Sequence, residues 1–206
     1  SGQDFTKIFE STRPSRIPGA PPTFMAMPAD FSYAKLQNAR LSGPHVQVTS
    51  YSHADLTGAD LSGIITGPRE LSFEGAHMER VDLSDAQTTA SNVSNAVLVG
   101  ARLSGSHLEM NAKQADFTGA DLSGAIIGGD FNNANFTNAK LVGTSFFPSN
   151  LNYTNFSGAD LAQASFENDT QNLCMKLDKG ALEAGGTRFV LNVLQLANNS
   201  QCPHSS

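Results

Sequence analysis

Aspartates recur along this chain at intervals of five residues, and carboxylates are the groups that general acid and base catalysis often uses. Asp55 and Asp60 form one such pair, and Asp116 and Asp121 form another. A catalytic pair needs two carboxyl groups whose environments separate their pKa values. Here each aspartate has the same place in a repeated five-residue motif, which accounts for its position without catalysis. We therefore predict that the chain has no catalytic residue and is not an enzyme.

The other residue types that could bind a metal or a cofactor are scattered. The five histidines have no metal-ligand spacing to one another or to the two cysteines; they are His45, His53, His77, His107 and His204. The glycine-rich stretch 124–129 lacks the lysine and the following helix of a phosphate-binding loop. We predict no metal and no cofactor. Cys174 and Cys202 are too few for a disulfide scaffold, and the sequence leaves open whether they pair.

The length and the net charge of the chain limit which other classes of protein it can belong to. The chain has 206 residues and a formal net charge of −6, which suits one domain with capping segments and argues against a general nucleic-acid binder. No stretch approaches the roughly 20 apolar residues that span a bilayer. The first residues also lack the basic and then apolar run of a signal peptide. These observations predict a soluble protein whose partner is another protein.

The five-residue motif predicts how the chain is built. Ala-Asp-Leu-Thr-Gly at 54–58 is followed at once by Ala-Asp-Leu-Ser-Gly at 59–63, and two similar units occupy 115–124. A period of five fits neither the 3.6 residues of a helix nor the two of a strand. One large and one small inward residue per five fit a chain that turns a corner every five residues. Four sides then make a coil, and residues 29–168 predict about seven coils stacked at roughly 4.8 Å, a rod of roughly 30 Å.

Residues twenty apart should lie above one another on the same side of such a rod. The pattern predicts that Phe136 lies over Phe156 and that Phe146 lies over Phe166. Core packing is the expected role of these rings.

The period breaks at three places. The spacing from Leu61 to Phe73 is twelve residues instead of ten, so residues 66–70 should bulge outward by two residues. The nine-residue spacings each imply one side that is a residue short; they run from Leu108 to Phe117 and from Leu122 to Phe131. Because loops on rigid scaffolds often bind partners, the bulge is a candidate partner-binding site, formed by Thr66, Gly67, Pro68, Arg69 and Glu70.

These repeats resemble the A(D/N)LXX signature of the pentapeptide-repeat family over about two thirds of the chain. The resemblance implies an all-β solenoid, a right-handed quadrilateral β-helix. It says little about function, because the family has several unrelated roles. It also leaves the location open between the bacterial cytoplasm and secretion into a host cell.

Charged residues should form ladders on the outside of the rod. One ladder carries Arg40, Asp60, Asp82, Arg102, Asp121, Lys140 and Asp160, and a neighbouring one carries Lys35, Asp55, His77 and Asp116. Some members of the family protect DNA gyrase with an acidic rod that mimics duplex DNA. Residues 29–168 hold 14 acidic and 7 basic residues and no cysteine. Alternating signs in the first ladder favour mutual neutralisation, which weakens this alternative.

The two ends should cap the rod. Residues 1–28 are predicted to form a short helical cap and a proline-rich connector, and residues 169–206 a helical hairpin and tail. The second helix of this hairpin is apolar enough to be a cap or a homodimer surface, through Phe189, Val190, Val193 and Leu194. The layout of the chain, repeats followed by a helical tail, is also similar to that of bacterial effectors in which a pentapeptide β-helix precedes a HECT-like ubiquitin-ligase module.

The sequence therefore predicts a non-catalytic scaffold that presents rigid flat sides to a protein partner of unknown identity. Two alternatives stay open. The chain could be the recognition domain of a bacterial effector whose catalytic module lies elsewhere, or a DNA-mimicking regulator of gyrase.

Overall fold

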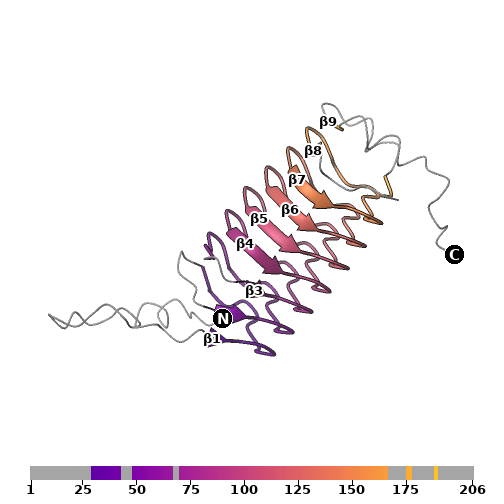
Figure 1. Cartoon of the computed structure of the whole chain (residues 1–206). Coiled ribbons are helices and arrows are strands. Elements are labelled where there is room, and N and C mark those ends of the chain that lie inside the picture. Colours follow the sequence, from indigo (N-terminus) through magenta and orange to yellow (C-terminus); the bar gives the residue numbers. More distant parts are fainter. Residues whose placement is uncertain (1–28, 43–47, 67–69, 167–174, 178–187, 190–206) are drawn as a thin grey trace, which may run out of the picture.

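The chain forms a rod in which every strand lies parallel to the one before it (Figure 1). The computed structural model describes residues 29–42, 48–66, 70–166, 175–177 and 188–189. One nine-stranded sheet runs in sequence order: β1 (Ala29–Asp30), β2 (Val48–Ser50), β3 (Leu71–Ser72), β4 (Gln87–Asn92), β5 (His107–Asn111), β6 (Ile126–Asp130), β7 (Ser145–Asn150), β8 (Ser165–Phe166) and β9 (Arg188–Phe189). The predicted all-β solenoid is confirmed.

Four ladders of paired residues define the sides of the rod. Side A is Asp30, Ser50, Ser72, Asn92, Asn111, Asp130 and Asn150. Side B is Lys35, Asp55, His77, Val97, Asp116, Asn135, Asn155 and Lys176. Side C is Arg40, Asp60, Asp82, Arg102, Asp121, Lys140 and Asp160. Side D is Ile65, Gln87, His107, Ile126, Ser145, Ser165 and Arg188. From Asp30 to Asn150 the chain makes six turns; the count of seven coils stays a prediction.

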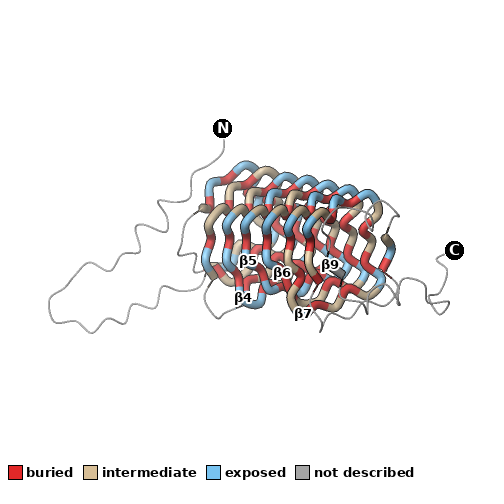
Figure 2. Tube along the Cα trace, turned by 90° about the horizontal axis from the view of Figure 1, so that it is seen from above, coloured by how far each residue is buried: buried red, intermediate tan, exposed pale blue. Residues whose placement is uncertain are grey.

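Burial alternates along every side, as the five-residue pattern requires (Figure 2). The large apolar residue of each unit points into the rod, and a small residue two positions earlier fills the adjacent corner of the core; Ala59 and Leu61 are both fully buried. The residues between them face outward. This arrangement lets a narrow rod exclude water from its interior with one bulky side chain per side.

Three of the four corners are tight turns. At the corner between sides C and D, for example, the N–H of Ala125 donates to the carbonyl of Leu122 at 2.9 Å, and Gly124 has a φ of +67°. This left-handed conformation favours glycine and tolerates asparagine, which explains why Gly and Asn recur at that place in the motif. The corner between sides D and A differs, because strands β4 to β7 run continuously through it.

The aromatic residues of the core stack as predicted. The rings of Phe136 and Phe156 lie 5.2 Å apart with planes 9° from parallel, and those of Phe146 and Phe166 lie 4.7 Å apart at 5°. The two columns meet edge to face, with 6.3 Å and 82° between Phe136 and Phe146. Offset and edge-to-face contacts are the geometries that aromatic rings prefer, so the columns tie consecutive coils together.

The three breaks in the period all fall at the corner between sides D and A. The two short sides run from Leu108 to Ala112 and from Ile127 to Phe131, whose ends are all buried. The longer spacing is also located there, because Ile65 pairs with Gln87 and Leu71 pairs with Ser91. Six residue steps in one coil therefore match four in the next, which is the predicted excess of two. Residues 67–69 of this segment lie outside the described residues.

The described residues near the C-terminus differ from the predicted helical hairpin. The N–H of Lys176 donates to the carbonyl of Thr154 at 2.9 Å, and the N–H of Phe156 donates to the carbonyl of Lys176 at 2.8 Å. β9 pairs with β8 in the same way. The physical reason is that the last coil offers an unpaired strand edge, which a following segment can satisfy. The rest of 169–206, with Cys174 and Cys202, and all of 1–28 lie outside the described residues.

Candidate protein-binding surface

Side C carries the predicted ladder of charges, in the predicted order. Arg102 lies 3.4 Å from the carboxylate of Asp82, and the Nζ of Lys140 lies 3.7 Å from that of Asp121. Both cationic side chains are 67% exposed. Exposed pairs of this kind contribute about 0–1 kcal/mol each, so this ladder neutralises its own charge and adds little to stability.

The aspartates have a local structural task in the corners. The Oδ1 of Asp60 accepts the backbone N–H of Ser62 at 3.0 Å, and the Oδ1 of Asn135 accepts that of Thr137 at 3.2 Å. This is the Asx turn, in which a short polar side chain takes an N–H that the turning backbone leaves exposed. It explains why either Asp or Asn occurs at this place, and it gives the recurring carboxylates a structural role.

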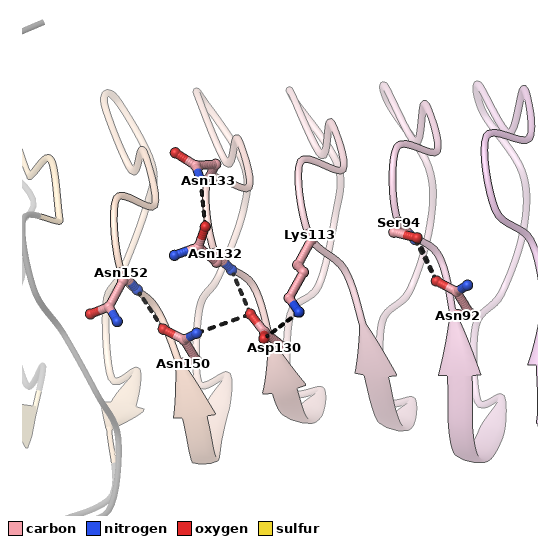
Figure 3. A network of polar contacts seen from close by, with 8 residues as sticks. All are labelled: Asn92, Ser94, Lys113, Asp130, Asn132, Asn133, Asn150 and Asn152. Atoms are coloured by element: carbon pink, nitrogen blue, oxygen red, sulfur yellow. Dashed lines mark hydrogen bonds and ion pairs between the residues drawn. The ribbon is translucent and has the colours of Figure 1, made fainter.

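Side A repeats the same arrangement with a polar network around β6 and β7 (Figure 3). The Oδ1 of Asp130 accepts the N–H of Asn132 at 3.1 Å and an amide hydrogen of Asn150 at 3.1 Å. Its Oδ2 lies 3.1 Å from the Nζ of Lys113. The polar groups of this side are thus engaged with one another from coil to coil.

The pKa values of the corner carboxylates predict that the rod becomes less stable at low pH. Partial burial raises the pKa of Asp121, but hydrogen bonds from Ser123 and the charge of Lys140 outweigh it, so its pKa lies below the usual 3.8. For Asp55, partial burial is likewise outweighed by hydrogen bonds from Thr57 and Gln37 and by the charge of His77, and its pKa is also lowered.

A lowered pKa in the folded state gives stability that is present above the unfolded value and is lost as the pH falls through the folded value. The free energy of unfolding should therefore stay level from neutral pH to about pH 5 and fall below about pH 4. Urea unfolding measured across this range checks the prediction. Asp121→Asn keeps the hydrogen-bond acceptor and removes the titrating group, so its loss at acid pH should be smaller than that of the natural chain. An equal loss would contradict this cause.

Side D offers a different surface where the strands are longest, at β4 to β7. The residues at the outward positions of β4 to β7 on this side form what we call the β4–β7 outer face, in which Gly128 is covered by Phe147: Gln87, Thr89, His107, Glu109, Ile126, Gly128, Ser145 and Phe147. Ile126 is 43% exposed. Ile65, which pairs with Gln87 from the coil before it, is 45% exposed. The face carries one full charge, at Glu109, whereas every outward position of the side C ladder is charged.

Phe147 is the aromatic residue of the β4–β7 outer face. Its ring lies directly on Gly128 of the preceding coil, where even a methyl group would overlap the ring. It meets the imidazole of His107 edge to face at a centroid distance of 5.9 Å. Gly128 thus provides the space that holds the aromatic ring against the backbone, and Phe147 remains half-buried there.

The predicted loop borders this face. The N–H of Thr66 donates to the carbonyl of Gln87 at 3.0 Å, and the N–H of Thr89 donates to the hydroxyl of Thr66 at 3.4 Å. Glu70 is exposed just before β3. Gly67, Pro68 and Arg69 lie outside the described residues.

The predicted cap or dimer surface is not brought together by the described part of the chain. The backbone of Phe189 belongs to β9, and Val190, Val193 and Leu194 lie outside the described residues.

Sequence reasoning missed Phe147 and Ile126. The five-residue pattern places Phe146 inward and says nothing specific about Phe147. The signal was available, because only one of two adjacent residues in a strand can point inward, and two adjacent phenylalanines therefore leave one on the surface.

A metal site and a membrane-spanning helix are two further features that a chain of this length can have. Among the described residues, no three His, Cys, Asp or Glu side chains could hold a metal ion together. Within these ranges there is also no helix long and apolar enough to cross a membrane.

A family model described as pentapeptide repeats matches eight copies, in residues 69–105, 89–129 and 130–168. None of the curated proteins compared with the chain matches it. Similar solved structures include a trypsin-treated form of QnrB1, a plasmid-mediated fluoroquinolone resistance protein, with 16% identity, coverage of 81% of this chain and 89% of that chain, and a TM-score of 0.36. Another is HetL of the cyanobacterium Nostoc sp. strain PCC 7120, involved in heterocyst differentiation regulation, with 22% identity, coverage of 78% and 80%, and a TM-score of 0.23.

A third is a protein from the Arabidopsis thaliana thylakoid lumen, with 25% identity, coverage of 53% of this chain and 66% of that chain, and a TM-score of 0.20. With TM-scores this low, the fold rests on the backbone pairing and the repeats of this chain itself.

Proposed function

Since this chain belongs to the pentapeptide-repeat family, we propose that it is a non-catalytic scaffold that binds a protein partner through the β4–β7 outer face. The observation that carries this proposal is a pair of apolar side chains on the outer face of the longest strands of the rod, Ile126, which is 43% exposed, and Phe147, which is half-buried. The centres of protein interfaces are depleted in charge and enriched in aromatic residues. This face has that composition.

The rod also suits binding for a reason of entropy. Every coil is held by hydrogen bonds to its neighbours, so a partner that docks on side D orders little of the scaffold. Preorganised surfaces lose less free energy on binding than surfaces that must first become ordered. Phe147, fixed against Gly128, has the character of an interface anchor.

The alternative of a DNA-mimicking regulator is less well supported by the charges. Phosphate mimicry needs a continuous acidic stripe, whereas side C alternates in sign except at Asp60 and Asp82. Its cations lie close to its carboxylates. The ladder therefore favours a partner that recognises the shape and apolar contacts of the rod over a partner that recognises a continuous row of negative charges.

Charge substitution on the proposed face tests this function. Ile126→Glu should reduce capture of the partner at least about tenfold, because it places an unpaired carboxylate in the centre of an apolar contact. Val99→Glu is the matched control, since Val99 is an aliphatic residue of similar exposure, 36%, at the corner between sides B and C. Both variants and the natural chain are immobilised at equal density, and captured proteins are quantified by mass spectrometry.

The expected result is a set of proteins retained by the natural chain and by Val99→Glu and lost from Ile126→Glu. Circular dichroism and thermal unfolding of the variants verify that both rods are folded. Equal retention by Ile126→Glu would overturn the assignment of the binding surface to side D.

A further inference from the structure

We propose that the β4–β7 outer face binds an arginine side chain of its protein partner, stacked on Phe147 and paired with Glu109. This inference rests on the proposed function and adds the chemistry of the partner. It starts from the charges: Glu109 is the single fully charged residue of the face. Exposed carboxylates also border it, at Asp85 before β4 and at Glu70 before β3.

Among the described residues, no ion pair joins Glu109, Asp85 or Glu70 to a cation. Among the described outward residues of β4 to β7 there is neither lysine nor arginine. The cation of the adjacent side, Lys113, lies 3.1 Å from Asp130 and is neutralised there. Sides B and C, by contrast, carry cations and carboxylates in the same ladders. The face therefore has a negative field that is complementary to a basic partner.

The pairing of the strands places the aromatic ring beside the carboxylate. Glu109 of β5 pairs with Gly128 of β6, and the Phe147 ring covers Gly128. Paired residues of adjacent strands lie about 4.8 Å apart. Because Gly128 has no side chain, the ring occupies the position next to Glu109, and His107 supports the ring edge from the same strand as Glu109.

Arginine is the residue that uses both groups at once. Its planar guanidinium stacks on an aromatic face and can donate two parallel hydrogen bonds to a carboxylate. The methylene groups of its side chain can contact Ile126, which is exposed on the same face. Lysine offers a point charge without the plane, so the geometry favours arginine within an otherwise aliphatic segment.

A pair of synthetic peptides tests the inference. One peptide is acetyl-Leu-Arg-Leu-Arg-Leu-amide, and the other replaces each arginine by citrulline, which keeps the planar shape and removes the charge. Binding to the full chain is followed by NMR, through the ring signals of Phe147 and the backbone signal of Gly128. The arginine peptide should bind about tenfold more tightly than the citrulline peptide, and Glu109→Gln should remove that preference.

Glu74→Gln is the control variant, because Glu74 is an exposed carboxylate at the corner between sides A and B, and it should leave the preference unchanged. Phe147→Leu should weaken both peptides while keeping an apolar side chain in place. Equal binding of the two peptides, or an unchanged preference in Glu109→Gln, would overturn the inference.

The two proposals fail in different ways. If the arginine preference is absent while Ile126→Glu still loses the captured proteins, the scaffold role stands and the arginine inference is wrong. If the preference is present but Ile126→Glu retains the same proteins as the natural chain, the arginine site exists and the proposed function is wrong.

Discussion

Phe136→Ala is expected to lower the free energy of unfolding by about 3–5 kcal/mol. Phe136 is fully buried and stacks between Phe117, at 4.6 Å, and Phe156, at 5.2 Å. It also meets Phe146 edge to face. Removing the ring leaves a cavity inside a rod whose coils pack on both sides of it, so the neighbours have little room to collapse into the space. Urea unfolding followed by circular dichroism measures the change.

Tyr33→Ala is the control for this substitution, because Tyr33 is 75% exposed at a corner. Its ring stacks on His53 at 5.1 Å, which is a surface contact. The expected loss is below about 1 kcal/mol. Comparable losses in the two variants would mean that the aromatic column does not hold the coils together.

Gly129→Ala is expected to destabilise the rod by about 3 kcal/mol or more. Gly129 has a φ of +109°, and a methyl group there would overlap the carbonyl oxygen of Met110 in the preceding coil. Backbone cannot move aside as a flexible side chain can. The substitution therefore combines a strained conformation with a clash in the strand pair β5–β6, and thermal unfolding should show a clear drop in the midpoint.

Gly63→Ala separates these two contributions. Gly63 also has a positive φ, +63°, but an added methyl group has open space around it. Its loss should be limited to the conformational strain, about 1–2 kcal/mol. If Gly63→Ala were as destabilising as Gly129→Ala, the close approach to Met110 would have no energetic consequence.

The sequence allowed the sides, the ladders and the two short sides to be predicted, because burial decides which residue of each five points inward. Leu108 and Leu122 mark the places where the count is one residue short, and both breaks lie where the pattern put them. The continuous strands at the corner between sides D and A were not predicted. The inward pattern is the same for a tight turn and for a strand that bends there.

The C-terminal segment shows a second limit. Leu173, Met175 and Leu177 belong to the segment 169–206 that is predicted to form a helical hairpin, but their spacing of two also fits a strand. Met175 is buried and Lys176 pairs with Asn155. What decides between the two is the open edge of the preceding coil, a tertiary feature that local spacing does not contain. The proposed β4–β7 outer face was missed for a related reason, since burial imposes no rule on the outward residues.

Site-specific crosslinking tests whether a protein partner docks on side D. The photoreactive residue p-benzoylphenylalanine replaces Ile126 on the β4–β7 outer face in one chain, and in another it replaces Val99 at the corner between sides B and C. After irradiation in the presence of the captured proteins, adducts are mapped by peptide sequencing. We expect adducts through position 126, with the crosslinked segment of the partner containing an arginine, and few through position 99. Adducts that form through position 99 and not through position 126 would contradict it.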